Sequence, residues 1–386
     1  MKIKFSVFIF DNFFGPNYLG VGRETTCSLF PCWGNYKFID FTLNLVDKIN
    51  FDSCHIFSSQ NVKKINTRVE HVLNSKASVY DFSEKSTRVI DAGNVFQLFH
   101  NIVNNEADDL LLFIIPGSVF FVQDLKELTP KNKREYTKCK KFSINNVPFE
   151  FFTIGKKYFM SFFNDFLHEQ GNYNDLVKVI FHKIFHNHID FIENINGMVY
   201  PMPDISAYYQ QNMNLFKYLC QTDFRKNYLN SQYFEKESSE AYIGVNGYVK
   251  DSIVFGDSKI YGYVENSIVF PKVNIAKNAK IINSIILPGN SIGTRAEVYN
   301  TLILSAKNEK PPITPNISDG CRIGELHNRM SNLTYPDIIY NGLTVIGENT
   351  DIPLGFRVGS GSLISANIPY MTIKSLKNVK NGHCVI

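Results

Sequence analysis

The sequence carries little net charge and no block of like charges. Its 386 residues hold 40 Lys and Arg against 36 Asp and Glu, a formal net charge of +4 at pH 7. Proteins that bind nucleic acid or membrane surfaces by electrostatic attraction gather positive charge in runs or patches. The even pattern excludes a basic arm of that kind, and we expect partners other than nucleic acid or membrane.

Paired cysteines and long apolar runs are also missing. The seven cysteines form no Cys-x-x-Cys pair, and an odd, unpatterned set is typical of free thiols in a reducing compartment. The apolar run in "MKIKFSVFIFDNFF" is interrupted by Asp11 and Asn12, so it is too short for a signal-peptide core or a membrane span. We expect a cytoplasmic protein whose first residues form a buried strand.

Residues 1–228 alternate short apolar runs with helical patterns. "IKFSVFIF", "CHIFSS" and "DDLLLFIIPG" predict strands, and "YKFIDFTLNLVDKI" and "GNVFQLFHNIV" predict helices between them. This alternation is typical of a doubly wound α/β domain with a parallel sheet. Ligands of such domains bind beyond the carboxyl ends of the strands. We therefore expect any chemistry in the segments after Phe10, Ser58 and Ile115.

A repeated seven-residue motif dominates the last third of the chain. "VKDSIVF", "VENSIVF", "IINSIIL" and "VYNTLIL" begin at residues 249, 264, 281 and 298, and apolar residues recur every six positions from residue 346. This is the hexapeptide signature of a β-helix, in which short strands stack turn upon turn. A run of β-hairpins would need turn dipeptides such as Asn-Gly, which are mostly absent. The pattern predicts a left-handed parallel β-helix.

The same reading divides the chain into three parts. Residues 229–241 are polar and without apolar period, which predicts a linker between the α/β domain and a β-helix over residues 242–386. Residues 305–320, rich in Pro, Lys and Asn, interrupt the coils. Because the six-residue rhythm resumes after them, they predict a loop that projects from the β-helix between two coils.

Two stretches carry a resemblance to a known family. "WGNYKFIDFTLNLVDKINFDSCHIFSSQ" at 33–60 and "ISAYYQQNMNLF" at 205–216 resemble segments of the glucose-1-phosphate adenylyltransferases, and the coils resemble that family's C-terminal domain. The resemblance implies a Rossmann-like nucleotidyltransferase domain joined to a β-helix. It also implies transfer of an adenylyl group from ATP to glucose 1-phosphate, which requires a phosphate cradle, a basic side chain and carboxylates for Mg²⁺.

At the positions to which the resemblance assigns these tasks, the chain departs from the family. Cys27 stands where the family has its lysine, and Ser118 and Pro201 stand where it has two metal-binding aspartates. None of these side chains carries the charge that phosphate or Mg²⁺ needs. The Gly-x-Gly of "LGVGR" at 19–23 lies too far from the first strand to replace the family's glycine-rich loop. We expect no catalytic and no metal-binding residue in this chain.

Two charged residues offer a rebuilt site as an alternative. Asp204 lies three residues beyond Pro201, and Arg23 lies four residues before Cys27. Asp204 also directly precedes the "ISAYY" helix, where aspartate is a favoured N-cap. We expect the capping role.

A retained fold with missing site residues resembles the D-type regulatory subunit of the family. The resemblance implies a non-catalytic regulatory subunit of glucose-1-phosphate adenylyltransferase in glycogen or α-glucan synthesis. Its partner would be a catalytic subunit, in a heterotetramer, that holds ATP and Mg²⁺; no cofactor is expected in this chain. The alternatives are a homo-oligomer, an active sugar-phosphate nucleotidyltransferase using Asp204 and Arg23, and a protein that senses a sugar phosphate or nucleotide.

Three further features bear on possible sites. His182 and His186 lie four residues apart, with His188 beyond, a spacing that zinc can use. The apolar residues of that helix lie on its other face, so we expect a solvated surface. No histidine occurs between residues 243 and 304, which argues against an acyltransferase base between coils. Trp33 replaces a family glycine, and we expect it to fill space.

Overall fold

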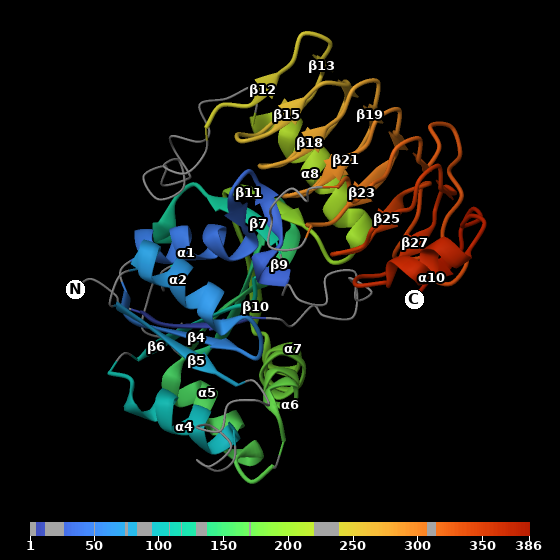
Figure 1. The fold of residues 1–386 in the computed structure, drawn as a ribbon. Coiled ribbons are helices and arrows are strands. Elements are labelled where there is room, and N and C mark those ends of the chain that lie inside the picture. Colours follow the sequence, from blue (N-terminus) through green and yellow to red (C-terminus); the bar gives the residue numbers. More distant parts are fainter. Residues whose placement is uncertain are drawn as a thin grey trace.

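The chain folds into an α/β half followed by a β-helix (Figure 1). The computed structural model describes residues 5–11, 27–49, 51–73, 76–82, 95–107, 109–116, 118–128, 137–169, 171–219, 239–306 and 314–386. Both halves match the predicted fold class. The predicted linker lies outside the described residues up to residue 238.

A seven-stranded sheet with the order β10-β8-β9-β6-β1-β4-β5 forms the centre of the α/β half. β5, β4, β1 and β6 run parallel, as the alternation of strands and helices predicts. The bounds of the strands are β1 (Phe5–Phe10), β4 (Phe51–Ser58), β5 (Ala77–Asp81), β6 (Leu110–Ile114), β8 (Cys139–Ile144), β9 (Val147–Gly155) and β10 (Phe191–Ile195).

The sheet departs from the parallel prediction at β9. This strand runs antiparallel to both β6 and β8. Asn145 and Asn146, the two residues between β8 and β9, have φ angles of 51° and 63°. Two left-handed residues in a row form the tight hairpin turn that joins antiparallel strands, and asparagine tolerates this conformation better than most residues. The turn therefore makes the sheet mixed.

Helices cover both faces of the sheet (Figure 1). Val7 and Ile9 of β1 point to one face and Phe8 and Phe10 to the other, because successive side chains of a strand alternate. The first face packs against α1 (Phe38–Lys48) and α2 (Val62–Leu73). The second packs against α4 (Val95–Asn105), α5 (Lys156–Phe163), α6 (Tyr173–Lys178) and the π-helix Val179–Phe185, which continues into α7 (His186–His188).

The second face is crowded with aromatic rings. Phe113 stacks on Phe8 with ring centroids 5.1 Å apart, and Phe152 stacks on Phe185 at 4.4 Å. Aromatic pairs in such arrangements are worth about 0.5–1.5 kcal/mol beyond the area they bury. Ring packing thus fixes this layer of the α/β half.

A second, smaller sheet lies between the large sheet and the β-helix. Its strands β7 (Ser118–Val122) and β11 (Gly197–Pro201) pair antiparallel, and α8 (Ile205–Leu219) follows β11. A short hairpin of β2 (Pro31–Trp33) and β3 (Tyr36–Lys37) lies before α1. These elements carry apolar side chains that the large sheet does not bury.

Three parallel sheets form the sides of the β-helix, as the six-residue rhythm predicts. The first holds β12 (Tyr242–Ile243), β15 (Lys259–Ile260), β18 (Asn274–Ile275) and β21 (Ser291–Ile292). The second holds β13 (Tyr248–Lys250), β16 (Tyr263–Glu265), β19 (Lys280–Ile282), β22 (Glu297–Tyr299), β24 (Arg322–Ile323) and β26 (Arg357–Val358). The third holds β14 (Ile253–Val254), β17 (Ile268–Val269), β20 (Ile285–Ile286), β23 (Thr301–Ile303), β25 (Thr344–Ile346), β27 (Leu363–Ile364) and β28 (Cys384–Val385).

The repeated Asp/Asn-Ser/Thr dipeptide of the sequence forms one corner of these coils. The corner residues Asn266, Asn283 and Asn300 have φ angles of 44°, 49° and 45°. Their side-chain amides bond from coil to coil, since Asn266 Nδ2 donates to Asn283 Oδ1 at 2.7 Å and Asn283 Nδ2 donates to Asn300 Oδ1 at 3.1 Å. The next residues add a hydroxyl ladder, in which the N–H of Ser284 donates to Ser267 Oγ. The motif repeats because successive coils need the same corner.

The predicted loop at residues 305–320 lies partly outside the described residues, at 307–313, and Ile317 near its end pairs with Ile292 and Ile352 as part of a coil. An excursion that was not predicted comprises residues 324–343, between β24 and β25. Asn300 Nδ2 donates to the carbonyl oxygen of Glu325 at 2.6 Å. The asparagine ladder therefore ends on this excursion. A helix, α10 (Tyr370–Ser375), lies near the C-terminal end.

An apolar cluster joins the two halves. It includes Tyr208 and Leu215 of α8 together with Ile285 and Leu302 of the β-helix. Trp33 is buried, and its ring meets Phe255 of the β-helix edge-on at 5.2 Å. Trp33 thus fills space, as expected, but it does so between the halves.

Candidate functional site

Polar contacts join the carboxyl ends of β1 and β4, where the fold predicts ligand binding; residues 12–26, which follow β1, lie outside the described residues. Asp11 directly follows β1, and its carboxylate accepts a hydrogen bond from Ser58 Oγ at the end of β4, at 2.5 Å. The Tyr173 hydroxyl at the start of α6 lies 2.7 Å from the Asp11 carbonyl oxygen and 2.9 Å from that of Phe57. The groups that end these strands therefore bond to one another.

Aromatic rings cover the same strand ends. The Tyr173 ring stacks on Phe82 at 5.6 Å and on Phe10 at 6.5 Å. Burial, together with the nearby Asp11 charge, raises the pKa of Tyr173 well above its usual value. Tyr173 is thus a neutral hydroxyl inside the protein, and it offers no charge to a phosphate.

The two positions at which the family resemblance places metal-binding aspartates are neighbours in the structure. Ser118 opens β7, Pro201 ends β11, and the two residues are directly paired in the antiparallel register. Opposite residues in such a pair have Cβ atoms about 4.5–5.5 Å apart, a spacing at which two carboxylates could share one cation. The structure therefore brings together the two residues that the sequence comparison singled out, and neither carries a carboxylate.

Asp204 is engaged in capping α8, as predicted. The backbone N–H of Ala207 donates to Asp204 Oδ1 at 2.7 Å. Partial burial raises the pKa of Asp204, while the N–H groups of Ala207 and Ser206 oppose the rise. Its carboxylate satisfies the first turn of the helix, which has no intrahelical acceptor for those N–H groups.

The remaining candidates do not form a second site in the described residues. Cys27 begins a short 3₁₀ helix, Cys27–Leu29, before β2, and Arg23 and the Gly-x-Gly at 19–23 lie outside the described residues. His182 and His186 are exposed, as expected, beside a cavity of about 220 Å³ that Lys141 and Glu150 also line. His188 instead stacks on Phe162 at 3.8 Å. Within the described ranges, no three His, Cys, Asp or Glu side chains are grouped to hold a metal ion.

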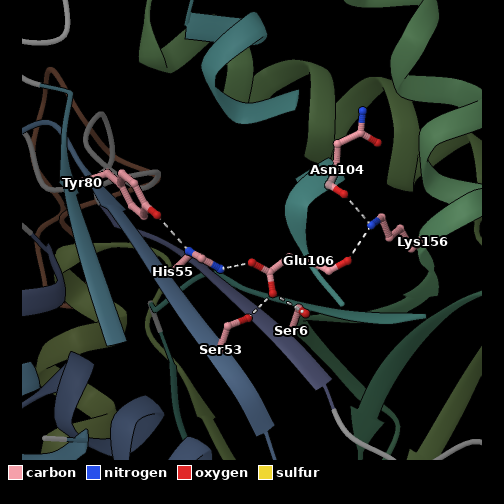
Figure 2. Close-up of polar contacts among 7 residues, drawn as sticks. All are labelled: Ser6, Ser53, His55, Tyr80, Asn104, Glu106 and Lys156. Carbon is pink, nitrogen blue, oxygen red and sulfur yellow. Dashed lines mark hydrogen bonds and ion pairs between the residues drawn. The ribbon is translucent and has the colours of Figure 1, made fainter. Parts of the chain in front are cut away.

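A polar cluster that the sequence did not reveal lies at the opposite edge of the large sheet (Figure 2). His55 Nε2 donates to Glu106 Oε1 at 2.7 Å, and the hydroxyls of Ser6 and Ser53 donate to Glu106 Oε2. The Tyr80 hydroxyl lies 3.1 Å from His55 Nδ1. Although Glu106 is partly desolvated, the donors His55, Ser53 and Ser6 lower its pKa to about 2.

This cluster fastens the end of α4. Lys156 Nζ donates to the carbonyl oxygens of Asn104 and Glu106, at 2.9 Å and 2.7 Å (Figure 2). Those carbonyls belong to the last turn of α4 and the residue just after it, where a helix lacks internal donors. Ser6 and Ser53 lie near the amino ends of β1 and β4. The contacts tie helix and sheet at the edge where ligands of such folds do not bind.

A second buried charge explains the "IDF" stretch of the sequence. Asp40 of α1 is fully buried and accepts hydrogen bonds from the N–H of Lys37, at 2.6 Å, and from Arg68 of α2. Arg68 also donates to the carbonyl oxygen of Asn35 at 3.1 Å. Burial raises the pKa of Asp40, and the Arg68 guanidinium opposes the rise. Asp40 thus holds the β2–β3 hairpin against the helices.

Comparisons with known proteins relate both halves to characterised sequences. A family model described as "GlmU-like, C-terminal hexapeptide" matches residues 238–333. A glucose-1-phosphate adenylyltransferase of Acetivibrio thermocellus is 30% identical over 192 residues, which cover 48% of this chain and 43% of that protein. Another, of Mycoplasma mobile, is 24% identical over 296 residues, which cover 65% of this chain and 77% of that protein. The chain thus spans less than half the length of the first relative and about three quarters of the second.

The fold defines a class of protein in which a Rossmann-like α/β half is joined to a hexapeptide β-helix. Within that class, the similarities support a relation to the glucose-1-phosphate adenylyltransferases, as the resemblance predicted. In the described residues, none of the helices combines the length and the apolar character needed to cross a bilayer.

Proposed function

We propose that this chain is a non-catalytic, regulatory subunit related to the glucose-1-phosphate adenylyltransferases. The observation that carries the proposal is the direct pairing of Ser118 with Pro201. Two carboxylates at such neighbouring positions would hold a magnesium ion, which must neutralise a triphosphate for adenylyl transfer. A hydroxyl and a proline ring in their place supply no charge.

The contacts at the strand ends support the same proposal. The carboxylate of Asp11 is bonded to Ser58, and the Tyr173 ring covers the end of β1. Removing one preorganised electrostatic contact from a reaction site typically costs about 3–4 kcal/mol of transition-state stabilisation. The lost charges at 118 and 201 act as a unit, so their effects do not simply add, but both lower the rate.

A regulatory subunit requires a catalytic partner. We propose a heterotetramer with a catalytic glucose-1-phosphate adenylyltransferase that binds ATP and Mg²⁺ and serves glycogen or α-glucan synthesis in the cytoplasm. This chain would contribute the surface through which a sugar-phosphate effector acts on its partner.

Co-expression with a catalytic homologue from the same cell tests the proposal. The two chains should co-purify, the chain alone should form no ADP-glucose from ATP, glucose 1-phosphate and Mg²⁺, and its presence should change the partner's response to activators. Failure to co-purify together with an unchanged activator response would refute the regulatory role.

Two substitutions distinguish a rebuilt active site from a helix cap. Asparagine caps helices about as well as aspartate but carries no charge, so Asp204→Asn retains the cap and removes a potential metal ligand. Asp204→Ala removes both. If the chain alone forms ADP-glucose and Asp204→Asn abolishes this activity while the fold persists, the chain is an active nucleotidyltransferase and the proposal is wrong.

A further inference from the structure

A cavity of about 200 Å³ lies where the two halves meet. One wall is α8, another is the asparagine corner of the coils, and the third is the excursion of residues 324–343. Its lining residues are Ser206, Tyr209, Gln210, Asn283, Asn300, Leu326, Arg329, Tyr340, Asn341 and Leu343. Leu326 and Arg329 also line an adjoining open groove, so the cavity is continuous with the surface.

Some of the polar groups around this cavity are already bonded within the protein. Tyr209 donates to the carbonyl oxygen of Asn283 at 2.5 Å, and the N–H of Tyr340 donates to Ser206 Oγ at 3.2 Å. The amides of Asn283 and Asn300 belong to the corner ladder. These contacts fix the walls relative to one another, so the cavity keeps its shape without a ligand.

Other polar groups around the cavity have no such role. In the described part of the chain, the side chains of Gln210, Arg329 and Asn341 and the hydroxyl of Tyr340 make no hydrogen bond or ion pair. Burial, with the nearby Asp204 charge, raises the pKa of Tyr340, so its hydroxyl keeps its proton and can donate. One guanidinium, two amides and one phenol therefore line the same space.

This set favours a ligand with several hydroxyl groups. Amides and a phenol both donate and accept, as the hydroxyls of a sugar do, and a guanidinium offers a planar fork of donors. Among the described residues that line the cavity, none has a carboxylate and Arg329 is the only cation. A nucleoside triphosphate or a bisphosphate would need several cations to replace the water around its charges.

We propose that this cavity binds an uncharged, hydroxyl-rich ligand of the size of a single sugar ring. Gln210 and Asn341 would bond its hydroxyls from opposite walls, and Arg329 would close the open side. The proposal concerns a site away from Ser118 and Pro201, and it does not depend on the regulatory function proposed above.

Calorimetric titration of the full chain with glucose tests this inference. We expect saturable binding in about the millimolar range, weakened about tenfold or more by Gln210→Ala and by Arg329→Gln, since each removes a hydrogen-bonding group from the site. Gln211→Ala, one residue along α8 and outside the cavity lining, is the matched control and should bind as the unmodified chain does. Equal thermal midpoints establish that the variants remain folded.

Parallel titrations with inorganic phosphate and glucose 1-phosphate separate the ligand classes. Phosphate should not bind in the same range, and the phosphate group of glucose 1-phosphate should add little affinity. No saturable binding of glucose, or equal binding by Gln210→Ala and Arg329→Gln, would overturn the site. Tighter binding of phosphate than of glucose would overturn the ligand class. These results differ from those of the co-purification experiment, so either proposal can fail alone.

Discussion

The two halves of this molecule use polar residues in opposite ways. In the β-helix, the same asparagine and serine positions return in successive coils, where Asn266, Asn283 and Asn300 bond from one coil to the next. In the α/β half, polar residues occur in single clusters, each with its own partners, such as Asp11 with Ser58 and His55 with Glu106. A repeated contact is specified by a pattern, whereas a single cluster is specified by individual residues. This difference explains how the fold of the α/β half can persist while its expected site residues differ.

The largest expected effect is the loss of a ring from the aromatic layer of the α/β half. Phe113 is fully buried, with rings of Phe8, Phe159 and Phe185 around it. We expect Phe113→Ala to lower the free energy of unfolding by about 3–5 kcal/mol, because it leaves a cavity in a packed core. Urea denaturation measures the loss. Ile192→Ala, at a position 55% exposed on β10, is the control and should change stability by less than about 0.5 kcal/mol.

A smaller loss is expected at the corner ladder. Asn283→Ala removes two side-chain hydrogen bonds and places alanine at a φ of 49°. The expected loss is about 2–3 kcal/mol. Asn283→Gly removes the same bonds without backbone strain and should cost less. If both variants unfold at the same urea concentration as the unmodified chain, the ladder adds nothing to stability.

Acid should weaken the single cluster at Glu106 but not the ladder, which has no titratable group. The pKa of Glu106 is lowered to about 2 from an ordinary value of 4.5. A lowered folded-state pKa contributes stability that is present above the ordinary value and is lost as pH falls toward the folded one. The difference in stability between the unmodified chain and Glu106→Gln should therefore shrink between about pH 4.5 and pH 2. A difference that stays constant over this range would contradict the ion-pair geometry. Thermal unfolding at each pH provides the measurement.

The smallest expected effect tests whether the lost site can be restored. Ser118→Asp combined with Pro201→Asp places two carboxylates on directly paired residues. We expect Mg²⁺ at ten times its dissociation constant to stabilise this double variant by about 1.4 kcal/mol. Either single variant alone serves as the control and should respond less. Thermal midpoints with and without Mg²⁺ report the effect, and no response from the double variant would show that the pair cannot hold a cation.

Most of the architecture could be predicted from the sequence, because periodicity is a local signal. The four copies of the motif at residues 249–304 predicted the β-helix, and the alternation of "IKFSVFIF" with helical patterns predicted the parallel strands. The antiparallel β9 could have been predicted as well, since Asn145 and Asn146 form a recognisable hairpin turn. Asp204 as a helix cap also follows from sequence, because the cap and the helix are adjacent in the chain.

Long-range contacts between single residues could not be predicted in this way. Glu106 meets Ser53 and His55 about fifty residues earlier in the chain, and no repeat or spacing marks these partners. The excursion at residues 324–343 carries no repeat that marks it, so the cavity beside Gln210 could not be predicted. The pairing of Ser118 with Pro201 was found only as two separate positions of a family resemblance, and the structure supplied their adjacency.

The helix α8 lies across the stack of coils (Figure 1), and the cluster it shares with them runs from Ile268 of β17 to Leu363 of β27. A helix of 15 residues is about 22 Å long, and neighbouring strands are about 4.8 Å apart. Its length therefore matches between four and five coils. Solenoids commonly gain or lose whole units. A coil gained or lost beneath α8 would misalign every later contact between the helix and the coils. The length of α8 therefore constrains the number of coils beneath it, while individual residues remain free to change.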